Sequence, residues 1–187
     1  MATETSLWRR LDLPGHEIAS LDELDQGWKL SGTALFLCEE GPTKLDYAVV
    51  CDSSWRTDSA QISGAIGKRR VSLNVSVDAQ RKWHLNGVEC RAVEGCLDID
   101  LGFSPSTNLL PIRRLALAVS NEATVRAAWL PFPSLDFALL PQVYRREGKT
   151  TYLYESAGGA FVRTLEVNAV GFVTTYPGLW VAEPTPS

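Results

Sequence analysis

The segment Val71-Ser72-Leu73-Asn74-Val75-Ser76-Val77 decides the fold class, because apolar and polar residues alternate along it without a break. Successive side chains of a β-strand point to opposite faces of the sheet, so this period of two is typical of a half-buried strand. The segment therefore predicts one strand of a sheet that has an apolar face and a polar face.

A strong hairpin signal follows this strand. Asn86-Gly87 stands between Trp83-His84-Leu85 and Val88, and both central residues of a type I′ turn need a positive φ. Other turn signals separate the later apolar runs, namely Glu39-Glu40-Gly41-Pro42, Glu147-Gly148 and Ala157-Gly158-Gly159. Short connections of this kind favour antiparallel neighbours over helical crossovers.

Similar runs continue along most of the chain. Together they predict strands over residues 28–37, 44–52, 58–67, 71–77, 88–93, 96–101, 124–130, 135–146, 150–155, 161–167 and 171–175. About ten strands in one open sheet would leave long unpaired edges, so the sheet is expected to curl. The predicted fold class is mainly β: a long antiparallel meander curled into a roll or incomplete barrel.

Helix is scarce in this sequence. Residues 108–117 predict one short helix, in which Pro111 is compatible only with the first turn, and residues 21–26 predict a short turn. With no repeat and no internal linker, the chain is expected to form a single domain over residues 1–187. Its tail from about residue 183 is expected to fray, since Pro184 and Pro186 cannot join a central strand.

Composition narrows the range of partners. The chain has 187 residues, 45% of them hydrophobic and 21% charged, with a net charge of −4, which suits one buried core. Its basic residues are too scattered to form a nucleic-acid-binding face, so no nucleic-acid partner is expected. The first ten residues contain no signal-peptide core, and no apolar run approaches the roughly 18 residues of a membrane span. The expected compartment is the cytoplasm, and an integral membrane protein is not expected.

The cysteines do not form a metal-binding pattern. Cys38, Cys51, Cys90 and Cys96 lack a paired CxxC spacing, and neither histidine stands at a metal-ligand spacing from them. Free cysteines usually act as small core residues, and thiols stay reduced in the cytoplasm. We therefore expect no metal and no cofactor.

The polar segment from Gly95 to Arg114 is where chemistry would lie. On a strand, Asp98 and Asp100 share a face at a separation of about 6–7 Å. Two carboxylates so placed bind a cation or divide acid and base roles, or they are neutralised by Arg113 or Arg114. An isolated DxD pattern is a weak signal, and we favour the structural interpretation. The chain also lacks the GxSxG, phosphate-loop and HExxH motifs of common enzymes.

Aromatic residues form the second notable group, spread over nearly every predicted strand. They are Trp28, Tyr47, Trp55, Trp83, Trp129, Phe137, Tyr144, Tyr152, Tyr154, Phe161, Tyr176 and Trp180. Any one of them is best explained by ordinary core packing. Collectively they predict an apolar cavity with a few polar groups, because curled sheets often enclose ligands.

One family matches these motifs in order along nearly the whole chain. The segment Gly95-Cys96-x-Asp98-x-Asp100-Leu101-Gly102-x-Ser104-Pro105-x-Thr107-Asn108-x-Leu110-Pro111-Ile112-Arg113-Arg114 resembles the central motif of the putative glycolipid-binding family, formerly a domain of unknown function. Further matching segments are Pro14-Gly15-His16-Glu17, Gly27-Trp28-x-Leu30-x-Gly32, Tyr47-x-Val49-x-Cys51-Asp52-x-x-Trp55, Gln142-x-Tyr144 and Gly171-Phe172-Val173. The resemblance implies a sheet wound into a roll, similar to bacterial lipoprotein carriers that hold acyl chains. It assigns no catalytic residue.

Together, the aromatic pattern and the resemblance predict a binding protein for a glycolipid or another amphipathic ligand. Trp28, Trp55 and Trp83 are the expected wall residues, and Arg113 with Asp98 or Asp100 is expected to meet a polar headgroup. Asn108 and Tyr144 complete the predicted ligand-binding set. Two alternatives stay open: an enzyme that uses Asp98 and Asp100, and a protein–protein module that uses a sheet edge. The sequence predicts no oligomeric state.

Overall fold

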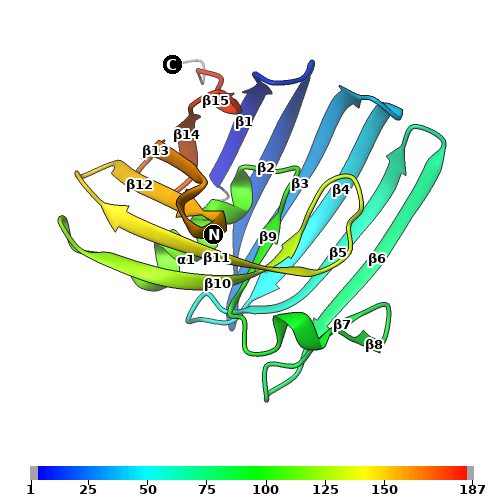
Figure 1. The fold of residues 1–187 in the computed structure, drawn as a ribbon, viewed down its shortest axis with the longest axis horizontal. Helices are drawn as coiled ribbons and strands as arrows, with labels where there is room; N and C mark the ends of the chain where they lie inside the picture. Colours follow the sequence, from blue (N-terminus) through cyan, green and yellow to red (C-terminus); the bar gives the residue numbers. More distant parts are fainter. Residues whose placement is uncertain (1–3, 185–187) are drawn as a thin grey trace.

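The computed structural model describes residues 4–184, which build one 15-stranded sheet (Figure 1). The strands are β1 (Glu4–Arg10), β2 (Gly15–Leu24), β3 (Gly27–Cys38), β4 (Gly41–Cys51), β5 (Thr57–Ile66), β6 (Arg69–Val77), β7 (Trp83–Leu85), β8 (Val88–Glu89), β9 (Asp98–Leu101), β10 (Glu122–Leu130), β11 (Ala138–Arg146), β12 (Thr151–Ser156), β13 (Phe161–Val167), β14 (Val173–Tyr176) and β15 (Trp180–Ala182). The helical turns are η1 (Arg91–Val93), η2 (Ser106–Asn108), α1 (Leu109–Leu115) and η3 (Ala157–Gly159). None of the described helices has the length and apolar character to cross a membrane.

Two meanders make up the sheet. Consecutive strands pair antiparallel from β1 to β8, and again from β10 to β15. The exception is β9, which pairs parallel with β10. The meanders meet where β1 pairs with β15, while β8 and β9 end the strand order and leave the described sheet unclosed. The mainly β, curled fold class is therefore confirmed.

The alternation that predicted the fold is visible in the burial of β6. Val71 and Val75 are buried, whereas Ser72 and Asn74 are exposed. The predicted hairpin is also present: β7 pairs with β8, and Asn86 and Gly87 have φ values of 51° and 81°. Both central residues of this turn thus take the positive φ that a type I′ turn requires.

The chain fills the inside of its own roll. Between β9 and β10, the chain runs through η2 and α1, and Phe103, Leu109 and Leu110 on this stretch are fully buried. Phe103 packs edge-on against Tyr47 of β4, with ring centroids 6.0 Å apart. Figure 1 shows the green helical turns of this internal segment between the two halves of the curled sheet. The sequence predicts an apolar cavity with a few polar groups, and the structure has separate pockets next to this segment.

Several elements differ from the sequence-based expectations. β1, β2 and β15 were not predicted, and the turn expected over residues 21–26 is confined to Asp25-Gln26. The sequence pattern did not predict β2, because the charged Glu17 is buried on its inner face while the apolar Ile18 faces solvent. This is the reverse of the usual arrangement, in which apolar residues face inward. The strand predicted over residues 88–93 stops at Glu89 and continues as η1.

The structure contains the predicted helix and part of the predicted tail. The helix over residues 108–117 is confirmed as η2 followed by α1, and Pro111 lies in the first turn of α1 as expected. At the tail, the Glu183 backbone N–H donates to the Leu7 carbonyl at 2.8 Å. Residues 185–187 of the predicted frayed tail lie outside the described residues.

Candidate functional site

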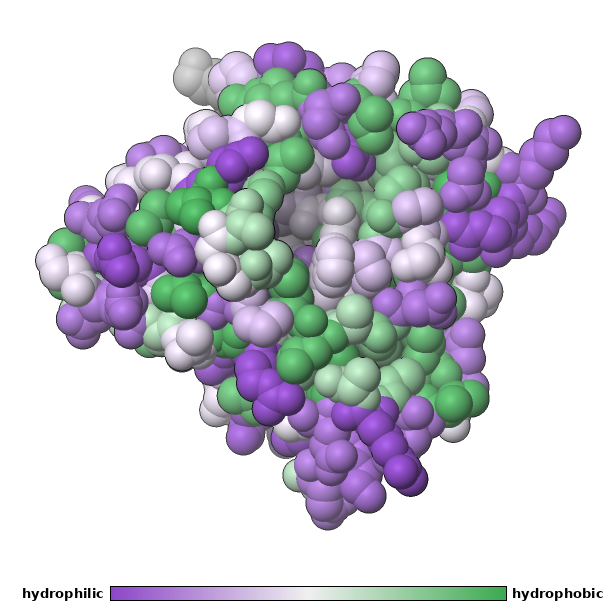
Figure 2. Space-filling model, viewed as in Figure 1, coloured by the Kyte–Doolittle hydropathy of each residue, from purple (hydrophilic) through white to green (hydrophobic). Residues whose placement is uncertain are grey.

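An aromatic pocket of about 330 Å³ lies beside the internal segment, between that segment and strands β11 to β15. Figure 2 shows a hollow on the face that carries η3, bordered mainly by apolar and neutral residues, with the charged residues further out. The residues that line this aromatic pocket are Asp100, Leu101, Gly102, Ser104, Asn108, Trp129, Leu140, Tyr154, Ser156, Ala157, Phe161, Tyr176, Leu179 and Trp180.

Gln142 positions two polar side chains of the aromatic pocket through hydrogen bonds. The Gln142 Nε2 donates to Asp100 Oδ2 at 2.6 Å and to the Tyr154 hydroxyl at 3.0 Å. Gln142 is itself buried on the inner face of β11, next to β12, which carries Tyr154. This places a carboxylate and a phenol at the pocket wall in fixed positions.

Burial changes the acid–base character of these groups. It raises the pKa of Asp100 to about 6, an effect that the Gln142 hydrogen bond reduces and the nearby Asp98 charge increases. Burial also raises the pKa values of Tyr154 and Tyr176, and the Asp100 charge adds to both shifts. The two phenols are therefore neutral donors at physiological pH, and Asp100 is an acceptor whose charge changes close to that range.

Aromatic rings surround these polar groups. The ring of Tyr154 lies 5.1 Å from Tyr144, 6.1 Å from Phe161 and 6.1 Å from Tyr176. The Tyr144 hydroxyl donates to Asn108 Oδ1 at 2.9 Å, which fixes the side chain of Asn108 at the pocket. Rings at 4.5–7 Å stabilise one another beyond their burial, so the pocket wall is pre-organised.

A second polar cluster lies behind Ser104. The Ser104 hydroxyl donates to Glu17 Oε1 at 2.5 Å, and the Tyr47 hydroxyl donates to the same oxygen at 2.6 Å. Ser106 joins through its hydroxyl, 2.7 Å from that of Ser104. Glu17 is almost fully buried, and this burial raises its pKa to about 7. The cluster ties β2 and β4 to the internal segment and backs one wall of the aromatic pocket.

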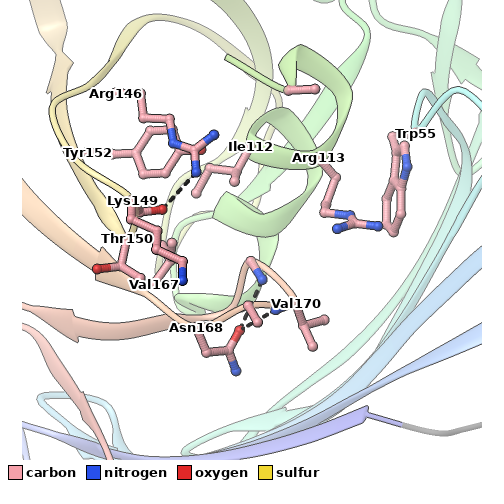
Figure 3. A pocket seen from close by; sticks show the side chains of 13 residues that line it. Trp55, Ile112, Arg113, Arg146, Lys149, Thr150, Tyr152, Val167, Asn168 and Val170 are labelled. Carbon is pink, nitrogen blue, oxygen red and sulfur yellow. Dashed lines mark hydrogen bonds between the residues drawn. The ribbon is translucent and has the colours of Figure 1, made fainter. Parts of the chain in front are cut away.

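A larger, basic pocket of about 670 Å³ lies beside α1, at the opposite end of strands β11 to β14 from the aromatic pocket (Figure 3). It opens between α1, the β4–β5 connection, the β11–β12 connection and the β13–β14 connection. The residues that line this basic pocket are Trp55, Ile112, Arg113, Ala116, Arg146, Lys149, Thr150, Tyr152, Val167, Asn168, Ala169, Val170 and Gly171.

Two of the predicted tryptophans meet at the edge of the basic pocket. Trp28 and Trp55 are stacked, with ring centroids 4.4 Å apart and planes 14° apart. The guanidinium carbon of Arg113 lies 5.0 Å from the centre of the Trp55 ring. Trp55 reaches this position with a φ of 66°, which is unusual for a bulky residue.

The predicted site residues thus fall into three places. Asp100 and Asn108 line the aromatic pocket, and Tyr144 supports it. Trp55 and Arg113 line the basic pocket, with Trp28 stacked on Trp55.

The two remaining predicted residues are structural in their contacts. Trp83 has no exposed surface, and its Nε1 donates to the Cys96 carbonyl at 3.1 Å. Asp98 is paired with Arg114 through two hydrogen bonds. Neither residue lines the aromatic or the basic pocket.

Sequence reasoning did not single out Gln142 or Glu17. Gln142 stands two residues before Tyr144, and on a strand both side chains therefore point to the same face. That spacing could have predicted that Gln142 lies next to Tyr144 on the aromatic inner face of the sheet. Glu17 lies in the segment Pro14-Gly15-His16-Glu17, which matches the family. No local spacing indicated its burial, because its neighbours in space come from distant parts of the sequence.

The chemistry of the aromatic pocket suits non-covalent recognition. Within residues 4–184, no group of three or more His, Cys, Asp or Glu side chains is placed to hold a metal ion. The aromatic pocket offers flat apolar ring surfaces together with one carboxylate, one amide and hydroxyl groups. A few fixed polar groups in a mostly apolar wall are typical of small-molecule binding sites.

Comparison with known proteins supports the family suggested by the motifs. The family model described as "Putative glycolipid-binding" matches residues 5–182. A crystal structure, at 1.80 Å resolution, of a DUF1089 family protein from Pseudomonas aeruginosa has a TM-score of 0.78 and 32% sequence identity to this chain. The match covers 88% of this chain and 91% of that one. No curated protein matches the sequence.

Proposed function

Because the chain belongs to the putative glycolipid-binding family, we propose that it binds an amphipathic ligand of the glycolipid type in the aromatic pocket. The observation that carries this proposal is the Asp100–Gln142–Tyr154 hydrogen-bond chain, which lies among aromatic rings. Sugar hydroxyls need donors and acceptors, whereas the C–H faces of a sugar ring need flat apolar surfaces. The aromatic pocket supplies both.

The volume of the pocket decides which part of such a ligand it takes. At about 330 Å³, it lies near the lower end of the roughly 300–1,000 Å³ seen for small-molecule sites. That space suits a single ring with its substituents and is too small for a headgroup and long acyl chains together. We assign the pocket to the polar ring, with the apolar tail leaving through the mouth.

The test uses n-octyl β-glucoside below its micelle concentration as the amphipathic probe, with glucose and octanoate as its separate halves. Tryptophan fluorescence reports binding, since Trp129 and Trp180 line the pocket. Leu140→Trp fills the pocket from its rim without removing a buried polar group. Leu139→Trp is the matched control, because Leu139 is exposed on the opposite face of β11.

We expect octyl glucoside to bind wild-type protein and the Leu139→Trp variant alike, and to lose binding to the Leu140→Trp variant. Asp100→Asn keeps the shape and removes the charge, so it should weaken binding by up to about tenfold. Equal binding to the wild type and the Leu140→Trp variant would overturn the proposal. So would an absence of binding to wild-type protein, both in the titration and in native mass spectrometry.

We also propose the cytoplasm as the compartment. All four cysteines are free, which suits a reducing environment. Fractionation of the native host with an antibody to the protein tests this assignment, and recovery from an oxidising compartment would contradict it.

A further inference from the structure

The basic pocket carries a second inference, independent of the aromatic pocket. Among the described residues, its lining contains Arg113, Arg146 and Lys149 and no aspartate or glutamate. The whole chain has 22 acidic against 18 basic residues, so this composition runs against the overall charge. A concave surface lined by charges of one sign concentrates ions of the opposite sign.

Arg113 is available for a ligand. Its side chain projects from the last turn of α1, is exposed, and lies over the ring of Trp55. Within residues 4–184 its guanidinium forms no hydrogen bond or ion pair, whereas its neighbour Arg114 donates two hydrogen bonds to Asp98. The Trp55 ring orients the guanidinium without using its N–H donors, which stay free to bind an oxyanion in a bidentate manner.

The opposite side of the pocket has a fixed positive charge. Arg146 donates to the carbonyls of Leu117, Gly148 and Lys149 at 2.7–3.1 Å. These acceptors hold the side chain in place, and among residues 4–184 its guanidinium has no carboxylate partner. Lys149 is exposed beside it (Figure 3).

Asn168 fixes the β13–β14 connection that forms another wall of the pocket. Its Oδ1 accepts the backbone N–H groups of Val170, Gly171 and Phe172 at 3.0–3.1 Å. In Figure 3 these bonds hold Oδ1 on the loop, and Nδ2 lies on the side of the amide away from Arg113 and Arg146, so Asn168 shapes this wall of the pocket. The carboxylate of Glu166 accepts from the Thr150 and Thr151 hydroxyls and is not part of the lining.

The geometry points to an oxyanion site. We infer that the basic pocket binds a phosphate- or sulfate-type group, with Arg113 and Lys149 as direct contacts and Arg146 as a fixed background charge. The volume of about 670 Å³ is far larger than one such ion, so the group belongs to an organic molecule. That molecule is either a soluble phosphate ester or the headgroup of an anionic lipid.

Three probes separate these sources: inorganic phosphate, glucose 1-phosphate, and vesicles of phosphatidylglycerol in phosphatidylcholine. Calorimetry measures the soluble probes, and flotation measures the vesicles. Arg113→Gln and the double variant Arg113→Gln/Lys149→Gln remove charge from exposed side chains. Arg70→Gln is the matched control, because Arg70 is an exposed arginine of β6 outside the basic pocket.

We expect at least one probe to bind wild-type protein and the Arg70→Gln variant equally. Arg113→Gln should weaken that binding about tenfold, as expected for the loss of a charge-assisted bond, and the double variant should abolish it. Binding should also weaken as salt rises. Leu140→Trp, which blocks the aromatic pocket, should leave it unchanged.

Three results would overturn the inference. One is that none of the three probes binds the wild-type protein. Another is that the double variant binds as well as wild type, which would place the anion elsewhere. The last is an equal loss in the Arg70→Gln variant, which would mean that general surface charge is responsible.

Discussion

Arg114 binds Asp98 through two parallel hydrogen bonds, Nε to Oδ1 at 3.0 Å and Nη2 to Oδ2 at 2.6 Å. The Asp98 side chain is 1% exposed and that of Arg114 is 16% exposed. Asp98 begins β9 and Arg114 lies in the last turn of α1. The ion pair therefore fastens α1 of the internal segment to the start of β9.

Breaking this ion pair should be costly. Arg114→Ala leaves the Asp98 carboxylate buried without its partner, and such losses typically cost about 3–5 kcal/mol. Urea unfolding at pH 7 measures the change. The matched control is Arg145→Ala, which breaks the exposed pair between Arg145 and Glu122 and should cost far less, because solvent screens exposed ion pairs. If the two variants lose similar free energies of unfolding, burial does not make the Asp98–Arg114 pair more important for stability than an exposed pair.

Glu17 should make the protein less stable as the pH rises from about 4.5 to about 7. Burial raises its pKa in the folded state from 4.5 to about 7, so the folded state binds more protons than the unfolded state in this window. Stability then falls with rising pH, by roughly 3 kcal/mol for this one group. Asp98 and Asp100 have raised pKa values too and add to the same trend.

The measurement is urea unfolding at pH 5 and pH 8 for wild type and Glu17→Gln. The glutamine keeps an acceptor for Ser104 and Tyr47 but cannot ionise, so the difference between the two pH values should shrink. Glu23→Gln, at the exposed end of β2, should leave that difference unchanged. An undiminished difference in Glu17→Gln would rule Glu17 out as its source.

The stacked rings of Trp28 and Trp55 should be energetically coupled. In a double-mutant cycle with leucine at both positions, the expected coupling is about 0.5–1.5 kcal/mol. As a control, Trp55→Leu should combine additively with Leu37→Ala. Leu37 is exposed near the far end of β3 from Trp28. A coupling near zero for the tryptophan pair would mean that each ring contributes only its own burial.

The four thiols should divide into two classes. Burial raises the pKa of Cys51 to about 12 and that of Cys96 to about 11, which leaves almost no thiolate at pH 8. Cys38 and Cys90 are partly exposed. Ellman's reagent should therefore titrate two thiols in native protein and four after unfolding. A Cys38→Ser/Cys90→Ser variant that still reacts quickly would contradict this division.

Much of the fold could be predicted from the sequence where each strand has one apolar face. β6 and the β7–β8 hairpin are examples, because local alternation and turn chemistry agree with the tertiary structure there. β2 could not be found this way, since Glu17 takes an inner position and Ile18 an outer one. The inner position of Glu17 depends on Ser104 and Tyr47, whose distance along the chain hides the contact from any local pattern.

The sequence indicated which residues belong to pockets, but it did not indicate which of them lie together in space. Asp100 and Trp55 were both identified, yet they lie in different pockets. The sequence did not reveal that the segment joining β9 to β10 passes through the middle of the roll. Inside the roll, the part of that segment before α1 lines one pocket and α1 lines the other, so one predicted site becomes two.

The pairing of β1 with β15 has a consequence for the order of folding. Within each meander, a strand needs only its neighbour in the chain, so hairpins can form locally and early. Contact between the meanders is different, since Arg9 and Glu183 in the β1–β15 region are 174 positions apart. Closing a loop of that size carries a large entropic cost, and such distant contacts slow folding. The meander β1–β8 and the meander β10–β15 should therefore collapse separately, and the pairing of β1 with β15 should be the late, slow step.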